Sequence, residues 1–266
     1  MSSKVIIVAA GRGRRLGPET EDIPKCMVRV AGQPILHWQL RAFAAAGLSD
    51  IVMVRGYLGD RIDGGRAALR FVDNPDWARN NILASLLCAA HELPEGFFFS
   101  YCDIVYTPGV VARLCASARD SAPVSLIIDR RWADAYQGRT LHPVSEAELG
   151  RTEGQGDDLR VVRVGKGAVP REDAVGEFIG LAHFSAAGAA ALRAVWDKAL
   201  AAGGWEAPFG LAPRLRQAYL TDALNAMAEQ GIRLRPVFID GQWREIDTPQ
   251  DLAAAQKIVA GWDGSS

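Results

Sequence analysis

The sequence predicts a single α/β domain in which helices flank a mostly parallel sheet. Short β-branched runs alternate with helical patterns from residue 5 to about residue 132, which is the order of crossover units on a parallel sheet. The chain has 266 residues, of which 49% are hydrophobic, enough for one large core. The first apolar run ends in a loop of glycines and arginines. We therefore expect one domain over residues 1–266, with ligands beyond the carboxyl ends of its strands.

The individual elements follow in chain order. Strands are expected at 5–10, 51–56, 69–74, 97–106, 123–132, 159–167 and 176–185, where β-branched and aromatic residues form short runs. Helices are expected at 35–48, 77–93, 110–118, 186–202 and 215–230, where apolar residues recur at helical spacing. Asn80 or Asn81 is the expected cap of the second helix. Asp247-Thr248-Pro249 opens a last helix and places Asp247 to cap it.

Residues 133–175 break this alternation. They are rich in Gly, Asp, Glu and Arg, and their one strand signal lies at 159–167. Such a composition does not supply a second hydrophobic core. We expect a small inserted hairpin or lid on the single domain.

Composition excludes several classes of protein. The net charge of −1 argues against a nucleic-acid-binding surface. The four cysteines form no CxxC pair and have no nearby histidine set, which predicts reduced thiols in a cytoplasmic protein, without a zinc site or a disulfide framework. The N-terminus runs directly into a strand, so we expect no signal peptide. No apolar segment approaches 18 residues, so we expect no membrane span.

The loop after the first strand has the composition of an anion-binding site. Residues 11–17 hold three glycines and three arginines, and Lys25 follows Pro24 a short distance on. Glycines let the backbone approach a phosphate closely, with amide groups pointing at its oxygens. Taken alone, the loop also fits an ordinary strand-to-helix turn with solvated arginines. Asp103 and Asp129, each at the end of a predicted strand, are expected at the same edge of the sheet.

Together these motifs resemble a known family. The shared segments are GRGRRL (11–16), PK (24–25), Asp103, GEFIGL (176–181) and WREIDTPQDL (243–252). In this order they resemble the nucleotidyltransferases of the nucleoside-diphosphate-sugar pyrophosphorylase superfamily, which implies their Rossmann-like fold. Segments 80–86, 127–148 and 218–227 look most like the cytidylyltransferases that act on phosphocholine and on phosphonates such as 2-aminoethylphosphonate. The resemblance implies transfer of CMP from CTP to such a small acceptor, with release of pyrophosphate.

The resemblance also implies a set of site residues. Nucleotide binding is expected from Ala9, Ala10, Gly11, Arg12, Gly13, Arg14, Arg15, Lys25, Asn81, Ala84 and Ser85. Lys25 and Arg15 are the expected catalytic cations, because both reactants are anions whose charge must be neutralised and whose atoms must be held in line. Asp103 and Asp247 are the expected ligands of Mg²⁺, which takes one or two carboxylates plus phosphate oxygens. The attacking oxygen is already ionised at pH 7, so no general base is required.

Four residues are expected to bind the acceptor: Asp129, Trp132, Tyr136 and Glu177. An aromatic ring beside carboxylates suits a cationic amine through cation–π contact and charge pairing. Glu177 equally suits a hydrogen bond to the hydroxyl of a sugar or hydroxyalkyl acceptor. His142 is interpreted as a loop residue.

Four other functions are compatible with parts of the sequence. A dinucleotide-binding oxidoreductase is disfavoured because Leu16 stands where the third glycine belongs and no acidic residue ends the second strand. A catalytically silent domain of the same fold is disfavoured by the joint presence of Arg15, Lys25, Asp103 and Asp247. A sugar-1-phosphate nucleotidyltransferase and a hydroxyalkylphosphonate cytidylyltransferase stay open, as do the exact acceptor and the oligomeric state.

Overall fold

The computed structural model describes residues 4–120 and 122–262 and contains one central mixed sheet. Its strand order is β10-β9-β11-β6-β1-β4-β5, with β8 beside β11 and β12 beside β8. The bounds are β1 Lys4–Ala9, β4 Asp50–Arg55, β5 Leu69–Asp73, β6 Phe97–Tyr101, β8 Val124–Asp129, β9 Glu148–Glu153, β10 Arg160–Lys166, β11 Gly176–Phe184 and β12 Leu234–Ile239. β1 runs parallel to β4 and β6, and β12 runs parallel to β8. β11 is antiparallel to β6, β8 and β9. The predicted mostly parallel α/β fold is confirmed.

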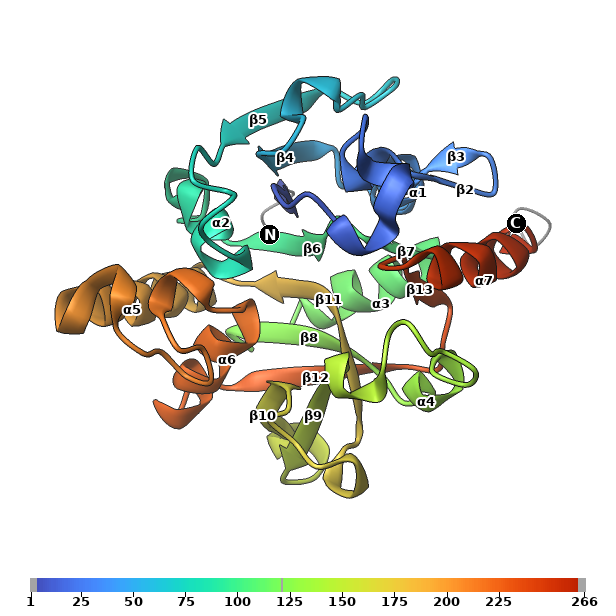
Figure 1. Ribbon diagram of the computed structural model, residues 1–266. Helices are drawn as coiled ribbons and strands as arrows, with labels where there is room; N and C mark the ends of the chain where they lie inside the picture. The colour runs from blue at the N-terminus through green and yellow to red at the C-terminus, as the bar shows by residue number, and fades with distance from the viewer. Residues whose placement is uncertain (1–3, 121, 263–266) are drawn as a thin grey trace.

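Helices cover both faces of the sheet (Figure 1). Their bounds are α1 Ile35–Ala45, α2 Ile82–Cys88, α3 Pro108–Ser117, α4 Trp132–Ala135, α5 Ala186–Gly203, α6 Leu220–Glu229 and α7 Pro249–Val259. Successive side chains of a strand point to opposite faces. In β1, therefore, Ile6 and Val8 pack in the cluster with α2, α5 and α6, whereas Val5 and Ile7 pack in the cluster with α1 and α3. This alternation makes the short apolar run of β1 a fully buried central strand.

Several expected elements are shorter than predicted. The predicted strand 97–106 is two strands, because the chain turns at residues 102–103 and β7 (Ile104–Tyr106) pairs instead with β13 (Trp243–Glu245). The predicted helix 77–93 contains only α2 and a separate 3₁₀ turn, and the helix 215–230 begins only at Leu220. Two further short strands, β2 (Arg29–Val30) and β3 (Gln33–Pro34), pair with each other.

The insertion at 133–175 contains the predicted hairpin. β9 and β10 pair antiparallel, and β9 joins the main sheet through β11. In Figure 1 this hairpin lies at the opposite edge of the molecule from β5. The sequence did not indicate β9, because its residues, ELGRTE, mix charged side chains with a glycine.

The start of α7 corrects one prediction. The helix is capped by Thr248, whose side-chain oxygen accepts from the backbone N–H of Asp251. The carboxylate of Asp251 in turn accepts from the backbone N–H of Thr248. This reciprocal capping box leaves the Asp247 carboxylate without a capping role. Asp247 therefore points its oxygens elsewhere.

Two predictions from composition can be compared with the described residues. All four cysteines are free thiols. None of the helices described has the length and apolar character that crossing a bilayer requires.

Candidate active site

A cavity of about 370 Å³ opens beyond the carboxyl end of β1. Its wall is made by the loop after β1, the start of α2, the turn between β6 and β7, and the beginnings of β9 and β11. The segment between β13 and α7 closes it. Elements from the whole chain therefore meet at the edge of the sheet where ligands of such folds bind.

The glycine loop lies on the cavity surface. Ala10, Gly11, Gly13, Arg14 and Arg15 line the cavity, whereas Ala9 is buried beneath it. Gly13 has φ of 68°, in the left-handed region. A Cβ atom there would lie 2.9 Å from the Lys25 side chain, so glycine lets the loop pack directly on this lysine.

Arg12 differs from its neighbours in the loop. It is exposed and absent from the cavity wall, and its guanidinium lies over the Tyr57 ring at 5.2 Å. Only two of the three loop arginines, Arg14 and Arg15, therefore reach the cavity.

Lys25 forms ion pairs with both carboxylates that were predicted to bind metal. Its Nζ donates to Asp103 Oδ2 at 2.7 Å and also to Asp247 Oδ1, and the lysine is only 6% exposed. Burial alone would lower the pKa of Lys25, but the two carboxylates outweigh it and hold this pKa well above its ordinary value. Burial opposes ionisation of Asp247 too, but Lys25 and Arg15 hold its pKa well below the usual range. Lys25 and Asp247 are therefore both charged at neutral pH.

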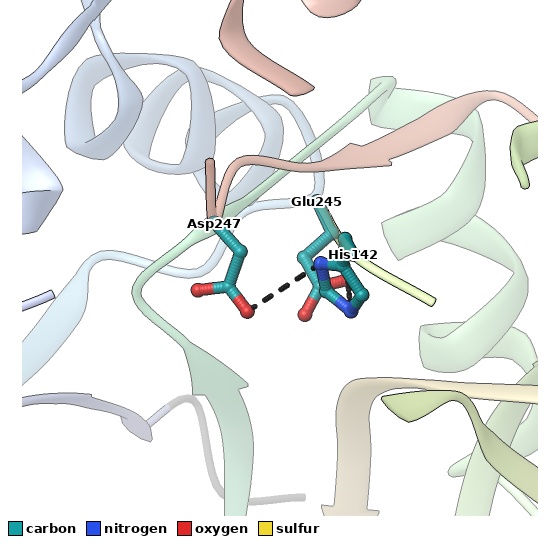
Figure 2. Close-up of side chains that lie close together, drawn as sticks. All are labelled: His142, Glu245 and Asp247. Carbon is teal, nitrogen blue, oxygen red and sulfur yellow. Dashed lines mark ion pairs between the residues drawn. The ribbon is translucent and has the colours of Figure 1, made fainter. Parts of the chain in front are cut away.

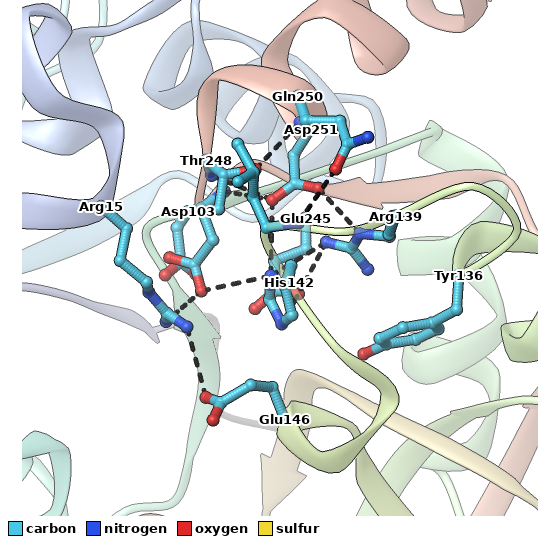
Figure 3. Close-up of polar contacts among 12 residues, drawn as sticks. Arg15, Asp103, Tyr136, Arg139, His142, Glu146, Glu245, Thr248, Gln250 and Asp251 are labelled. Atoms are coloured by element: carbon cyan, nitrogen blue, oxygen red, sulfur yellow. Dashed lines mark hydrogen bonds and ion pairs between the residues drawn. The ribbon is translucent and has the colours of Figure 1, made fainter.

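Arg15 joins the glycine loop to the opposite wall. One of its nitrogens donates to Asp247 and another donates to Glu146 Oε2 at 3.2 Å. Glu146 also accepts from Lys166 Nζ at 3.1 Å. Figure 3 shows Arg15 between Asp103 and Glu146. The cations at this end therefore already have carboxylate partners.

The start of α2 forms the wall beside the glycine loop. Asn81, one of the two residues predicted as the cap, caps α2. Its side chain accepts from the backbone N–H of Ile82. Asn80, Asn81 and Ser85 line the cavity. Ala84 does not line it, since its side chain is buried in the core cluster below.

The wall formed by β9 and β11 carries two buried glutamates. Glu148 on β9 and Glu177 on β11 line the cavity, and each is about 5% exposed or less. Glu148 accepts from the Tyr101 hydroxyl at 3.1 Å, and burial raises the pKa of Glu148 to about 7. Glu177 Oε1 accepts from the Tyr136 hydroxyl at 2.7 Å, while its Oε2 is buried and has no hydrogen-bond partner among residues 4–120 and 122–262. Burial and the neighbouring Glu245 raise the pKa of Glu177 well above its usual value.

Three of the four predicted acceptor residues lie outside the cavity wall. The Asp129 carboxylate accepts from Arg131 N, Gly241 N and Trp243 Nε1 at 2.7–3.0 Å, so it holds a turn together. Trp132 and Tyr136 pack against each other in a small apolar cluster. Tyr136 reaches the site only through its hydroxyl on Glu177. Glu177 alone of the four faces the cavity.

His142, which was interpreted as a loop residue, is 1% exposed and lies in a polar network. Its ring is 3.5 Å from Glu245 Oε2 and 3.7 Å from Asp247 Oδ2 (Figure 2). Arg139 approaches Nδ1 at 3.1 Å and also donates to Asp251 Oδ1 (Figure 3). Nδ1 also lies 3.4 Å from Asp251 Oδ2, so it has a donor, the Arg139 guanidinium, on one side and an acceptor on the other. The ligand atoms of His142, Glu245 and Asp247 all lie within 4.8 Å of one another, close enough to hold an ion.

Sequence reasoning missed Glu146, Glu148, Tyr101, Lys166 and Glu245. Glu146 ends a 3₁₀ turn and Glu148 begins β9, so no single periodicity in the sequence places these two acids on one face.

The fold and the cavity define an α/β protein with a candidate site at the carboxyl edge of its sheet, and the family follows from comparison with known sequences. Residues 5–234 match the family described as the MobA-like NTP transferase domain, and the chain belongs to this family.

Particular relatives cover nearly the whole chain. The CTP:phosphoglutamine cytidylyltransferase of Campylobacter jejuni is 29% identical over 260 residues, which is 93% of this chain and 96% of the relative. The 2-aminoethylphosphonate cytidylyltransferase of Lancefieldella rimae is 26% identical over 95% of this chain and 91% of its own length. The solved structure of CTP:phosphocholine cytidylyltransferase from Streptococcus pneumoniae has a TM-score of 0.70 at 22% identity, covering 96% of this chain and 98% of its own. This last similarity shows the fold.

Proposed function

We propose that the protein transfers CMP from CTP to a small phosphonate or phosphate acceptor with a cationic head group, releasing pyrophosphate. The observation that carries this proposal is that one cavity has two chemically different ends. Gly11, Gly13, Arg15 and Lys25 line it from the loop after β1 and the segment that follows, whereas Glu148 and Glu177 line it from β9 and β11, where Lys166 of β10 also lies. A reaction that joins a nucleotide phosphate to an acceptor with a positive head needs both.

The basic end suits a triphosphate. The glycine loop leaves backbone amides near the cavity, and Arg14, Arg15 and Lys25 supply positive charge. Lys25 is fixed by Asp103 and Asp247, so little reorganisation is needed when phosphate oxygens arrive. These side chains can hold the α-phosphorus in line with an attacking oxygen and offset the charge that builds up there.

Asp103 and Asp247 are the residues that would hold Mg²⁺. Their carboxylate oxygens are the donor type that this ion prefers, and Asp103 Oδ1 is buried without a hydrogen-bond partner. An orphaned carboxylate oxygen beside a phosphate-binding loop fits a cation that arrives with the nucleotide. When bound, the ion would neutralise negative charge on phosphate oxygens.

The acidic end supports a cationic acceptor head. Glu177 Oε2 is a buried acceptor without a donor, and such a group is costly until it is satisfied. An ammonium group would supply both the N–H donor and the opposite charge. The relatives named for 2-aminoethylphosphonate and phosphocholine agree with this assignment, and those named for CTP support the nucleotide.

A matrix of initial rates tests the proposal. Pyrophosphate release is measured with CTP, UTP, ATP and GTP against 2-aminoethylphosphonate, phosphocholine, 2-hydroxyethylphosphonate and glucose 1-phosphate. We expect the highest kcat/KM for CTP with an amine-bearing acceptor. Preference for a sugar phosphate with any nucleotide would overturn the acceptor assignment, and absence of turnover with every pair would overturn the proposal.

A further inference from the structure

Asn74, directly after β5, is buried behind the wall formed by the start of α2. It is 2% exposed and does not line the cavity. Its amide nevertheless contacts two residues that do line it, because Asn74 Nδ2 donates to Asn80 Oδ1 at 2.8 Å and to Ser85 Oγ at 2.9 Å. Asn74 thus connects the sheet to the surface that faces the cavity.

The orientation of these amides is fixed by the backbone. The N–H of Asp76 donates to Asn74 Oδ1 at 3.0 Å. A backbone N–H can only donate, so this atom of Asn74 is the oxygen and Nδ2 points toward Asn80 and Ser85. Asn80 must then present its oxygen to Nδ2, and its own Nδ2 returns a bond of 3.1 Å to Asn74 Oδ1. Neither amide can turn over without losing hydrogen bonds.

The same reasoning fixes Ser85. Its hydroxyl proton is donated to the carbonyl of Asn81 at 3.0 Å, while the oxygen accepts from Asn74. The cavity wall at Asn80 and Ser85 therefore offers donors and acceptors in one defined arrangement.

A fixed arrangement can separate the two pyrimidines. Cytosine and uracil have almost the same shape, but one carries an amino group where the other carries a carbonyl, and the ring nitrogen beside it changes from acceptor to donor. An asparagine that is free to turn its amide can satisfy either base. One whose amide is locked satisfies only one, because the wrong base leaves buried polar groups unpaired.

We propose that Asn74 is a positioning residue that sets the choice between CTP and UTP by locking the Asn80 amide and the Ser85 hydroxyl. The inference rests on the proposed function and on the expectation from sequence that Asn81 and Ser85, at the start of α2, bind the nucleotide. Asn74 itself touches no substrate.

The test compares CTP and UTP in Asn74→Asp. The new carboxylate keeps the shape and still accepts from Asp76 N, but it cannot donate to Asn80 or Ser85, so the Asn80 amide is released. We expect the CTP:UTP ratio of kcat/KM to fall about tenfold, the loss that one hydrogen bond carries. The change should lie in KM for the nucleotide and in the CTP dissociation constant measured without acceptor, with kcat for CTP nearly unchanged.

Asn225→Asp is the matched control. Asn225 is another buried asparagine, 5% exposed, and its amide bonds the backbone N–H and carbonyl of Val164, on β10. Its substitution also buries a carboxylate and loses a donor, so its melting temperature should fall comparably while the CTP:UTP ratio stays at the wild-type value. Asn74→Ala, which introduces no charge, replaces Asn74→Asp if that variant does not fold.

The outcomes distinguish a failure of the role of Asn74 from a failure of the proposed function. A wild-type ratio in folded Asn74→Asp and Asn74→Ala, or an equal loss of the ratio in Asn225→Asp, overturns the role of Asn74 and leaves the proposed function intact. Equal use of CTP and UTP by the wild-type protein overturns both the base preference in the proposed function and this inference.

Discussion

The two ends of the cavity differ in how their charges are compensated. At the basic end, Lys25 and Arg15 form ion pairs with Asp103, Asp247 and Glu146. At the acidic end, Glu177 has a neutral tyrosine hydroxyl on one oxygen and nothing on the other. The pKa values reflect this difference, because the pKa of Asp247 is lowered and the pKa of Glu177 is raised. Two cations are paired with carboxylates at the basic end, whereas Glu177 at the acidic end has no cationic hydrogen-bond partner among the described residues.

The difference also has an origin in the fold. The basic end is built by the loop after β1, by the turn between β6 and β7 that carries Asp103, and by the segment between β13 and α7 that carries Asp247. The acidic end is built by β9, from the insertion, and by the antiparallel β11. Under the proposed function, the acceptor could therefore be changed by substitutions in β9 and β11 without changing the loop after β1.

The largest expected effect is at the basic end. Asp103→Asn should lower kcat by about a thousandfold or more, because removal of a metal-binding carboxylate removes several kcal/mol of charge stabilisation. Asn can still accept from Lys25, so the fold should persist, as checked by circular dichroism. Asp60→Asn, at a carboxylate with 94% of its side chain exposed, is the control. A near wild-type rate for Asp103→Asn at saturating Mg²⁺ would remove Asp103 from the site.

The second effect concerns the base. We expect CTP to be preferred to ATP by at least about a hundredfold, within the range that hydrogen-bonded sites reach. The wall at Asn80 and Ser85 lies against the glycine loop, and the cavity of about 370 Å³ must also receive the acceptor. Competition assays with both nucleotides measure this preference directly. Equal use of ATP would show that the basic end binds phosphate without selecting the base.

A smaller effect is expected in stability. The folded-state pKa of Glu148 is raised to about 7, mainly by burial, so the native state binds more protons than the unfolded state between about pH 4.5 and pH 7. The contribution of Glu148 to the free energy of unfolding is therefore lost as pH rises through this window. Glu148→Gln should stabilise the protein at pH 8 relative to wild type by about 2–3 kcal/mol, with no gain at pH 4. Urea titrations at both pH values measure the difference, and an equal effect at both would contradict the buried acidic end.

The smallest effect is expected outside the cavity. Asp129→Asn should cost about 1–3 kcal/mol of stability, because the carboxylate that accepts three hydrogen bonds loses an acceptor. The ratio of amine to hydroxyl acceptors should not change. A changed ratio would show that the acidic end extends to Asp129.

The two ends of the cavity differ in how well the sequence predicts their residues. The glycine loop and Lys25 lie within one short segment whose composition indicates anion binding, and the cavity contains most of its predicted residues. Their roles remain predictions. Asp103 was found because it ends a strongly apolar run, although the turn that breaks this run was not expected.

The acidic end was harder to predict because its residues depend on tertiary contacts. Asp129 also ends an apolar strand, but a strand-end carboxylate can face a cavity or satisfy a nearby turn, and periodicity does not distinguish the two. Trp132 and Tyr136 stand among charged residues in sequence, yet they pack on each other under Arg171 and Arg139. Glu148 was missed because the strand that carries it has a polar pattern that appears as loop until β11 pairs with it.

The measurement that tests the two-ended cavity most directly is acceptor selectivity in Glu177→Gln. Initial rates with 2-aminoethylphosphonate and 2-hydroxyethylphosphonate, together with the CTP dissociation constant, are compared in wild type, Glu177→Gln and the exposed control Glu172→Gln. We predict that wild type prefers the amine, that Glu177→Gln erodes this preference by about tenfold or more, and that CTP binding is unchanged in all three proteins. A wild-type preference for the hydroxyl compound, or a loss of CTP binding equal to the loss of amine selectivity, would contradict the separation of the two ends.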